Sequence, residues 1–527
     1  MNARCIRGAA LAWLAAMGAA LPAAAELTRL ELASTRPFGK FLAGDYLISE
    51  GTVRGDLAPT EAIPGLDKAP RNARGRVEYS ARIVLIRPAD PGKGNGTLLV
   101  DIPNRGNAYA EALYNSPRDG PFQSGTLEQG TGFLQDHGFT VAEVSWELGK
   151  GAELPEFVDA DGKTRRYVEG AGFAIVRDAA DFLARGAADS AGTANPLAGS
   201  VKRVLASGKS QGGRFLKSFL LNGFNMASGH RVFDGMQVFV SGSGLLPILQ
   251  AGTGPESSAN GIPTFDEPDM RGVNEEPLAL ADLLAKVTAR GEALPKMIFQ
   301  NSTTDFYAIR ASLARTGASG TVEHPVPGSV RVYDVAGTSH VVVPRNPACT
   351  LPPNPLDWAP VSRALLLRLD EWVASGREPP ESRMMPLEPA PSLSAALPAP
   401  AHLPRAVIQV PRRDADGNAI GGVRLPDIEA PLGTHIGLNE PRSRGCMLIG
   451  GYLPFAYSRA GREGSGDPRL ALTERYANRD AYVERVRESA RRLQAEGFLL
   501  PEDAAIIIQA AASSKAFSTS GGGLDRR

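Results

Sequence analysis

Residues 201–221 have the sequence VKRVLASGKSQGGRFLKSFLL. The apolar stretch that opens it predicts a strand, and the amphipathic stretch that closes it predicts a helix. Between them, Gly208-Lys209-Ser210-Gln211-Gly212 predicts a sharp turn, because its glycines allow a tight bend. A serine at such a junction is lifted above a parallel sheet at the start of a helix, which is the geometry of a nucleophile elbow. We therefore expect Ser210 to be an activated serine.

The motif has two other interpretations. Gly208-Lys209-Ser210 is similar to the end of a phosphate-binding P-loop, but that loop needs glycine where this chain has Arg203. Ser210 as an ordinary turn serine is the other alternative, since a glycine-rich chain can match Gly-x-Ser-x-Gly by chance. The strand and helix patterns on either side favour the nucleophile, and hence a serine hydrolase.

The segments around the motif alternate between strand and helix patterns. Such alternation predicts a mostly parallel central sheet with helices on both faces, as in the α/β-hydrolase fold. Besides the elbow strand, buried strands are expected at 77–86, 96–103, 138–146, 236–240, 296–300 and 330–335, and helices at 168–184, 358–375 and 479–496.

The flanking and inserted segments suggest how the chain is organised. Residues 26–75 are rich in glycine and proline and predict an irregular N-terminal β extension to a catalytic domain at 76–385. Within that domain, residues 245–294 are too long for a simple crossover and predict a cap or lid insertion. Residues 386–527 are expected to pack on the core as a C-terminal extension of the same globular unit, with 513–527 disordered.

The first 25 residues have the features of a secretory signal peptide. Arg4 and Arg7 precede an apolar run from Gly8 to Leu21, and Ala23-Ala24-Ala25 offers a cleavage site before Glu26. The apolar run is too short for a durable membrane span, so we expect a soluble protein that is secreted or periplasmic. An N-terminal anchor that is not cleaved is the alternative.

Two cysteines remain after cleavage near Ala25, namely Cys349 and Cys446. In an oxidising compartment such an even pair can form a disulfide, and two buried free thiols are the alternative. No Cys-x-x-Cys or His-x-x-x-His spacing occurs, so we expect neither a metal nor a cofactor. The formal net charge is +0 and the basic residues are scattered, which argues against nucleic-acid binding.

A serine nucleophile needs a histidine as general base and a carboxylate that orients the imidazole. In α/β hydrolases the acid and then the histidine follow the nucleophile, on loops after late strands. His340 fits best, because a loop of small residues connects it to the strand at 330–335, whereas His324 precedes that strand and is expected on a surface loop. The remaining histidines are predicted to be structural or solvated: His137, His230, His402 and His435.

Asp305 is the predicted acid, because it stands in a polar segment just after the strand at 296–300. The alternative is that Asp305 only caps a helix that starts near Tyr307. Asp334 is a weaker candidate because it lies within a strand. Three further acids in the predicted cap are also weaker candidates: Glu256, Asp266 and Asp269.

The oxyanion hole is expected to use the backbone N–H of Gln211, the residue after the nucleophile, and a second N–H from the loop after an earlier strand. Arg105 or Gly106 fits the second place, and a tight turn that needs glycine for backbone reasons is the alternative. Arg214 and Arg310 either bind an acidic substrate group or serve as ordinary surface or ion-paired residues.

Several short motifs are distributed along the mature chain: NRGN at 104–107, SQGGRFL at 210–216, GFN at 223–225, RVFDG at 231–235, AGTSH at 336–340, VPR at 410–412, GGVRLP at 421–426 and GFLLPED at 497–503. Together they resemble a family of large, mostly uncharacterised bacterial α/β-hydrolase domain proteins. The resemblance implies the hydrolase fold, with Ser210 as nucleophile and His340 as base. Family members often have glutamate near the position of Asp305, and either carboxylate can orient the histidine. Because the resemblance covers most of the mature chain, it argues against an independent C-terminal binding module.

These features predict an exported serine hydrolase that cleaves small-molecule carboxylic esters through an acyl-enzyme on Ser210. An amidase, a peptidase or an acyltransferase with the same residues is an alternative. A non-catalytic exported binding protein with this fold is another. The sequence leaves open the acyl group, the alcohol and the oligomeric state.

Overall fold

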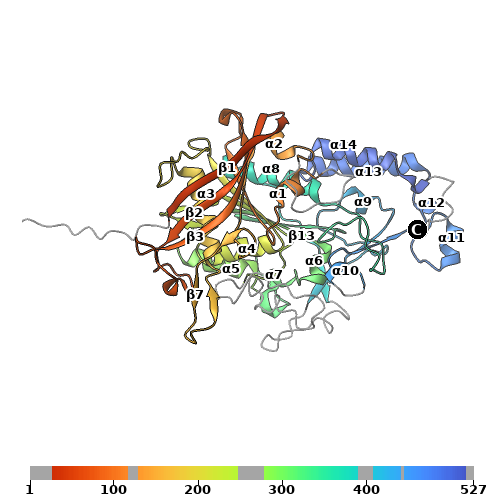
Figure 1. Ribbon diagram of the computed structural model, residues 1–527. Coiled ribbons are helices and arrows are strands. Elements are labelled where there is room, and N and C mark those ends of the chain that lie inside the picture. Colours follow the sequence, from red (N-terminus) through yellow and green to blue (C-terminus); the bar gives the residue numbers. More distant parts are fainter. Residues whose placement is uncertain (1–25, 117–128, 247–277, 390–407, 441–443, 518–527) are drawn as a thin grey trace, which may run out of the picture.

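The computed structural model shows a central sheet enclosed by helices (Figure 1). The predicted signal peptide and part of the predicted cap lie outside the residues that the structure describes. The described residues are 26–116, 129–246, 278–389, 408–440 and 444–517.

The central sheet has ten strands, in the order β1-β2-β3-β5-β4-β9-β12-β13-β14, and β6 pairs with β3. The strands from β5 to β14 in this order run parallel, and the strands before them pair antiparallel. The expectation of a mostly parallel sheet is therefore confirmed. The strands are β1 Glu26–Phe41, β2 Gly44–Leu57, β3 Val77–Pro88, β4 Thr97–Ile102, β5 Thr140–Val144, β6 Ala152–Glu153, β9 Arg203–Lys209, β12 Gly235–Phe239, β13 Lys296–Ser302 and β14 Val330–Val335.

The N-terminal segment is more regular than the extension predicted for 26–75. β1 and β2 form a long antiparallel hairpin, and β2 pairs with β3 from one end to the other, so both strands belong to the central sheet. The β character of this segment was predicted, but the prediction of irregular structure was wrong for β1 and β2. β1 is an edge strand, where proline is tolerated. One of three shifts in the β1–β2 register lies between Pro37 and Gly39, and such bulges accommodate residues that disrupt a regular ladder.

Helices cover both faces of the sheet, as expected. The helices α3 Ala171–Arg185, α4 Gln211–Leu221 and α5 Leu280–Ala289 contribute to one hydrophobic cluster, and α1 Ala110–Tyr114 and α8 Ala359–Ser375 contribute to the other. Strand β4 separates the two clusters, since Leu98 and Val100 enter the first and Leu99 enters the second. This alternation follows from the two-residue period of a strand, so that buried strands are apolar on both faces.

The remaining elements are short or lie in the C-terminal half. The helices are α2 Phe133–Asp136, α6 Thr303–Ala308, α7 Leu313–Thr316, α9 Pro426–Glu429, α10 Arg444–Met447, α11 Arg459–Ser465, α12 Leu472–Arg475, α13 Arg479–Ala495 and α14 Pro501–Ala512. Four two-stranded sheets complete the described residues. They pair β7 Glu156–Val158 with β8 Arg165–Tyr167, β10 Met226–Ala227 with β11 His230–Arg231, β15 Leu387–Pro389 with β16 Gln409–Pro411, and β17 Gly433–Ile436 with β18 Gly451–Pro454.

The described end of the predicted cap at 245–294 is part of the helical layer. Leu283, Leu284 and Val287 of α5 are buried, and α5 packs against α4. These residues recur at helical spacing and place one apolar face in the first hydrophobic cluster, so the cap assignment was wrong for α5. Residues 247–277 of the predicted cap lie outside the described residues.

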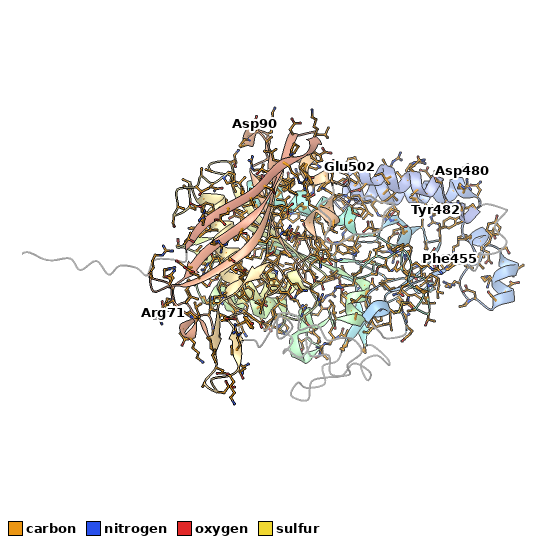
Figure 2. The ribbon with its side chains drawn as sticks, in the orientation of Figure 1. Arg71, Asp90, Phe455, Asp480, Tyr482 and Glu502 are labelled. Carbon is orange, nitrogen blue, oxygen red and sulfur yellow. A yellow bond between two sulfur atoms is a disulfide. The ribbon has the colours of Figure 1, made fainter. Side chains whose placement is uncertain are left out.

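The C-terminal part of the chain forms its own apolar cluster around α13. Phe455 and Tyr482 belong to this cluster (Figure 2), and the ring of Phe517 lies 5.3 Å from that of Tyr482. The ordered turn Lys515–Phe517 contradicts the disorder predicted from residue 513, because Phe517 is an aromatic anchor. Residues 518–527 lie outside the described part of the chain.

The C-terminal extension is joined to the core by buried contacts. The guanidinium of Arg363 in α8 donates two hydrogen bonds, of 2.6 and 3.1 Å, to the carboxylate of Asp503 in α14. Phe498 packs edge-on against Tyr333 of β14, with ring centroids 5.3 Å apart. Figure 1 shows α13 and α14 (blue) side by side at this end of the molecule. In the described part of the chain, no helix has the length and apolar character needed to cross a membrane.

Candidate active site

Ser210 occupies the turn between β9 and α4, and its backbone has the positive φ angle of 54°. Both flanking positions of the motif require glycine, because other backbone atoms lie too close to leave room for a Cβ atom. A Cβ atom on Gly208 would lie 2.5 Å from the carbonyl oxygen of Gly212, and one on Gly212 would lie 2.5 Å from the carbonyl oxygen of Ile102. The Ser210 N–H donates to the Phe239 carbonyl of the neighbouring β12 at 2.9 Å. The sharp turn expected from the sequence is therefore present, and contacts with two adjacent strands hold it.

The structure brings Ser210, His340 and Asp305 together from the segments that directly follow β9, β14 and β13. His340 Nε2 lies 3.0 Å from Ser210 Oγ, and His340 Nδ1 lies 2.7 Å from Asp305 Oδ1. An ionised carboxylate can only accept, so we assign the ring proton to Nδ1, which leaves Nε2 to accept from the serine hydroxyl. Asp305 and His340 are buried, and Ser210 is half-buried. This arrangement can deprotonate Ser210 during nucleophilic attack.

Asp305 also caps the helix α6, as the alternative interpretation proposed. The Ser302 N–H donates to Asp305 Oδ2 at 2.7 Å, and the Asp305 N–H donates to Ser302 Oγ at 3.3 Å. The two carboxylate oxygens are thus divided between the cap and His340. Capping and orientation of the imidazole are compatible, because the cap holds the carboxylate in place.

The other acids that the sequence nominated do not reach His340 or lie outside the described residues. Asp334 is buried and pairs with Arg315 and Asn301. The three acids of the predicted cap lie outside the described residues: Glu256, Asp266 and Asp269.

The other described histidines have partners elsewhere in the fold. His324 contacts Asp282 at 2.9 Å, and His230 contacts Asp181 at 2.5 Å. His137 packs against the ring of Phe133, whereas His402 lies outside the described residues. His435 is buried and, as described next, supports the loop that carries His340.

The loop that carries His340 is held by residues from distant parts of the chain. Asn354 is central to this support, since its Nδ2 donates to the Gly337 carbonyl at 2.6 Å and its Oδ1 lies 2.9 Å from His435 Nδ1. The Trp358 indole N–H donates to the carbonyl of Ser339 at 3.0 Å. Burial lowers the pKa of His435 to about 3, so this imidazole is neutral and donates from Nδ1. Sequence reasoning missed these contacts, because no local pattern links Asn354 to His435.

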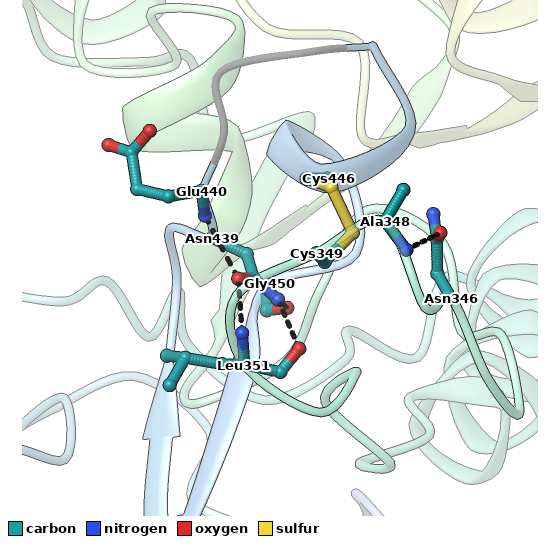
Figure 3. Close-up of a disulfide and its surroundings, with 8 residues drawn as sticks. All are labelled: Asn346, Ala348, Cys349, Leu351, Asn439, Glu440, Cys446 and Gly450. Atoms are coloured by element: carbon teal, nitrogen blue, oxygen red, sulfur yellow. Dashed lines mark hydrogen bonds between the residues drawn. A yellow bond between two sulfur atoms is a disulfide. The ribbon is translucent and has the colours of Figure 1, made fainter.

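A disulfide between Cys349 and Cys446 tethers the same loop to the C-terminal extension (Figure 3). Beside it, Asn439 Oδ1 accepts from the Leu351 N–H at 3.1 Å, and Asn439 Nδ2 donates to the Gly450 carbonyl at 2.7 Å. The structure thus contains the pairing that the sequence left open. The C-terminal extension is therefore part of the scaffold of the site.

The expected oxyanion-hole residues lie beside the elbow, but one of their N–H groups is engaged. The Arg105 N–H donates to the side-chain oxygen of Gln211 at 2.7 Å, so Arg105 is not an available backbone donor. Asn104 and Asn107 bond to each other across a tight turn. Gln211 is the first residue of α4 and directly follows Ser210.

Two buried ionisable groups next to the elbow were not predicted. The Lys209 ammonium lies 5.0 Å from the ring centre of Tyr109 and 5.5 Å from that of Trp358, and burial lowers its pKa to about 7. Glu147 follows the strand β5 and faces Gln211 and Arg105, and burial raises its pKa. The available signal for Lys209 was a lysine at the end of a strand with an otherwise apolar pattern. A cluster of three or more potential metal ligands does not occur in the part of the chain that the structure describes.

The strand order and the arrangement around Ser210 define an α/β-hydrolase fold. The chain belongs to the alpha/beta hydrolase domain family, whose sequence profile matches residues 43–509. This result confirms the family and the fold expected from the sequence. In a comparison with curated proteins, no sequence matches significantly.

Solved structures of esterases are similar to parts of the chain at low identity. A glucuronoyl esterase from Solibacter usitatus is 14% identical, with 58% of this chain and 81% of that chain covered and a TM-score of 0.27. One from Teredinibacter turnerae is 13% identical, with 60% and 75% covered and a TM-score of 0.29. One from Caldicellulosiruptor kristjansonii is 11% identical, with 67% and 82% covered and a TM-score of 0.31.

Proposed function

We propose that the protein is a serine hydrolase that cleaves carboxylic esters through an acyl-enzyme on Ser210. The observation that carries this proposal is the continuous chain of contacts from Ser210 Oγ to His340 Nε2 and from His340 Nδ1 to Asp305 Oδ1. In this series of contacts, Ser210 Oγ is placed to act as the nucleophile, His340 Nε2 as the general base, and Asp305 Oδ1 as the acceptor that orients the imidazole.

In the first half of the reaction, Ser210 Oγ attacks the ester carbonyl carbon while His340 Nε2 takes the hydroxyl proton. The tetrahedral intermediate collapses, the C–O bond to the alcohol breaks, and His340 gives its proton to the departing alkoxide. In the second half, His340 takes a proton from a water molecule while the water oxygen attacks the acyl carbon. The acid is released and Ser210 regains its proton. Asp305 stabilises the imidazolium that forms in both halves.

The negative oxygen of each intermediate is bound by backbone N–H groups in this proposal. Gln211 and Gly106 are the donors, since the Arg105 N–H is already bound by the Gln211 side chain. That bond joins the helix that supplies one donor to the loop that supplies the other. Preorganised donors of this kind stabilise the oxyanion without rearrangement during the reaction.

The proposal is tested by labelling the protein with a fluorophosphonate and mapping the adduct. One adduct on Ser210, together with hydrolysis of para-nitrophenyl acetate, is the expected result, and both are lost in Ser210→Ala without a change in melting temperature. Equal hydrolysis by Ser210→Ala would reject the proposal. Matched amides and alcohol acceptors in the same assay separate an esterase from an amidase or an acyltransferase. A labelled serine without turnover of any of these substrates would favour a binding protein.

Export is a second part of the proposal. The disulfide between Cys349 and Cys446 supports it, because such bonds persist in oxidising compartments. We expect the exported protein to begin at Glu26, which intact mass measurement of secreted or periplasmic material checks. Retention of residues 1–25 on the exported protein would contradict cleavage near Ala25.

A further inference from the structure

Lys209 is the last residue of β9 and directly precedes Ser210. It is only 3% exposed, and lysine is almost never buried so completely unless its charge is compensated. The reaction steps assigned to Ser210, His340 and Asp305 do not involve this ammonium. The contacts that compensate its charge therefore indicate its role.

The Lys209 ammonium contacts two aromatic rings from distant parts of the chain. Its Nζ lies 5.0 Å from the ring centre of Tyr109 and 5.5 Å from that of Trp358. Both distances are within the range of cation–π interactions, which become stronger when the cation is removed from water. The two rings therefore stabilise the buried charge and are joined through it.

Tyr109 belongs to the segment after β4 that contains Gly106, one of the two oxyanion donors in the proposed mechanism. The Tyr109 N–H donates to Asp101 Oδ2 at 2.6 Å, which fixes the backbone below the ring. In the same segment, Asn104 Nδ2 donates to the backbone carbonyl of Lys209 at 3.1 Å. Both the backbone and the side chain of Lys209 thus contact the segment that carries Gly106.

Trp358 supports the other side of the site. Its indole N–H donates to the carbonyl of Ser339, which directly precedes His340. Its ring also packs against that of Phe239 on β12, with centroids 5.6 Å apart. A contact between Lys209 and Trp358 therefore connects the strand of the nucleophile to the loop of the base.

The titratable groups near the ammonium come from three segments of the described chain. They are Tyr109 after β4, Asp305 after β13 with His340 bonded to it, and Asp357 directly before Trp358. Burial lowers the pKa of Lys209 to about 7, although Asp305 and Asp357 oppose this shift by favouring the charged form. The charge of Lys209 therefore changes near neutral pH.

We propose that Lys209 is a positioning residue whose charged ammonium, through the rings of Tyr109 and Trp358, holds the segment after β4 and the loop of His340 in place around Ser210. This inference rests on the proposed function of Ser210. An uncharged side chain of the same length would leave the two rings without the cation that they share, so each segment would move more independently of the other. A misplacement of 1 Å can cost about a hundredfold in rate, so a smaller shift is expected to cost about tenfold.

Lys209→Met tests the proposal, because methionine has a similar length and no charge. Below pH 7 we expect kcat for para-nitrophenyl acetate to fall by about tenfold. Above pH 7 the difference from the wild type should shrink, since the wild-type lysine itself loses its charge. A merely structural role would lower kcat by the same factor at every pH. A constant ratio of wild-type to variant kcat, or no loss at all, would overturn the proposal.

Lys209→Arg keeps the positive charge throughout the pH range of the assay, because arginine is not deprotonated in proteins. We expect this variant to retain more activity than Lys209→Met and to show no further loss above pH 7 that depends on residue 209. Less activity in folded Lys209→Arg than in Lys209→Met would overturn a role of the charge.

Lys296→Met is the matched control. The Lys296 ammonium lies 4.8 Å from the ring centre of Trp372, so this variant also removes a contact between a lysine and a tryptophan. Lys296 begins β13, whereas Asp305 follows the other end of that strand. We expect kcat to stay within about twofold of the wild type at every pH. A loss equal to that of Lys209→Met would overturn the proposal, because the effect would not depend on the site.

Tryptophan fluorescence of Ser210→Ala separates failure of this inference from failure of the proposed function. A charge in contact with an indole ring changes its emission, so we expect a change as the pH passes about 7. This change should be absent when Lys209→Met or Trp358→Phe is added. If the wild type forms no fluorophosphonate adduct and hydrolyses no ester but this change is seen, the serine hydrolase function is wrong and the contact of Lys209 with Trp358 stands. No change in emission that depends on Lys209 would overturn the inference itself.

Discussion

Ser210 and His340, which exchange a proton in the proposed mechanism, are held in different ways. Ser210 sits in a turn whose shape depends on residues within two positions of it, Gly208 and Gly212. His340 sits in a loop held by Asn354 and Trp358, and Asn354 is in turn bound by His435. One side of the site is specified locally and the other by contacts across the chain. The two sides should therefore respond to different kinds of substitution.

The turn that carries Ser210 should be the part of the site whose activity is most sensitive to a single added methyl group. In Gly212→Ala, the new Cβ would lie 2.5 Å from the Ile102 carbonyl oxygen, so the elbow or the neighbouring strand β4 must move. A shift of about 1 Å at the nucleophile lowers kcat by about a hundredfold or more, and assay of the purified variant measures it. Gly464→Ala is the control, because a Cβ there meets nothing within 4 Å. Full activity of Gly212→Ala would show that the elbow is not constrained as described.

Loss of a contact that holds the loop of His340 should lower activity, because His340 would be misplaced. Asn354→Ala removes the bond to the Gly337 carbonyl and the partner of His435, and leaves buried polar groups without a bond. We expect kcat to fall by about tenfold with KM unchanged, and the free energy of unfolding to fall by about 1–3 kcal/mol. Steady-state kinetics and urea unfolding measure both.

Asn346→Ala is the matched control, since Asn346 lies on the same loop and its side-chain oxygen accepts from the nearby Ala348 N–H (Figure 3). We expect it to leave kcat within about twofold of the wild type, because the affected contact does not reach His340. If Asn346→Ala lowers kcat as much as Asn354→Ala does, the loop as a whole and not the contact with Gly337 positions His340.

Loss of the disulfide should affect stability more than activity. The bond closes a loop of 97 residues, and in the chain-entropy model its loss lowers the free energy of unfolding by about 4–5 kcal/mol. The hydrogen bonds around His340 remain, so we expect kcat of Cys349→Ser/Cys446→Ser to fall by only about twofold at temperatures where the protein stays folded. Thermal melting and kinetics of this variant, beside reduced wild type, check both values. A large loss of kcat in folded protein would show that the disulfide itself positions the loop.

Acid should lower the free energy of unfolding through His435, which supports the loop of His340, and this effect should be smallest near neutral pH. The pKa of His435 is about 3 in the folded protein and 6.5 in an ordinary environment, so the unfolded chain binds the proton more readily. The stability from neutral His435 is complete above pH 6.5 and declines as the pH falls toward about 3. His435→Asn should flatten this decline, which urea unfolding at neutral and acidic pH measures. His230→Asn is the control, since that side chain is 37% exposed, and an equal flattening would contradict the assignment to His435.

The difference between the two sides also explains which features could be predicted. The elbow, the parallel strands and the acid and histidine positions follow from short patterns, because strand periodicity and chain order restrict where such residues can lie. The N-terminal hairpin and α5 were assigned incorrectly. Proline and glycine in the N-terminal hairpin suggested irregular structure, whereas they are compatible with an edge strand and its bulges. The length of the segment that contains α5 suggested a cap, whereas α5 belongs to the helical layer.

The amino-acid sequence by itself determined the family, the position of Ser210 and the residue types available to activate it, because each depends on neighbours close along the chain. Only the tertiary structure decided that His340 and Asp305 meet Ser210, that the Arg105 N–H is bound by Gln211, and that Cys349 joins Cys446. It also placed Asn354 against His435. These features join residues far apart in the chain, and the packing that joins them depends on the shape of the whole core rather than on any local pattern.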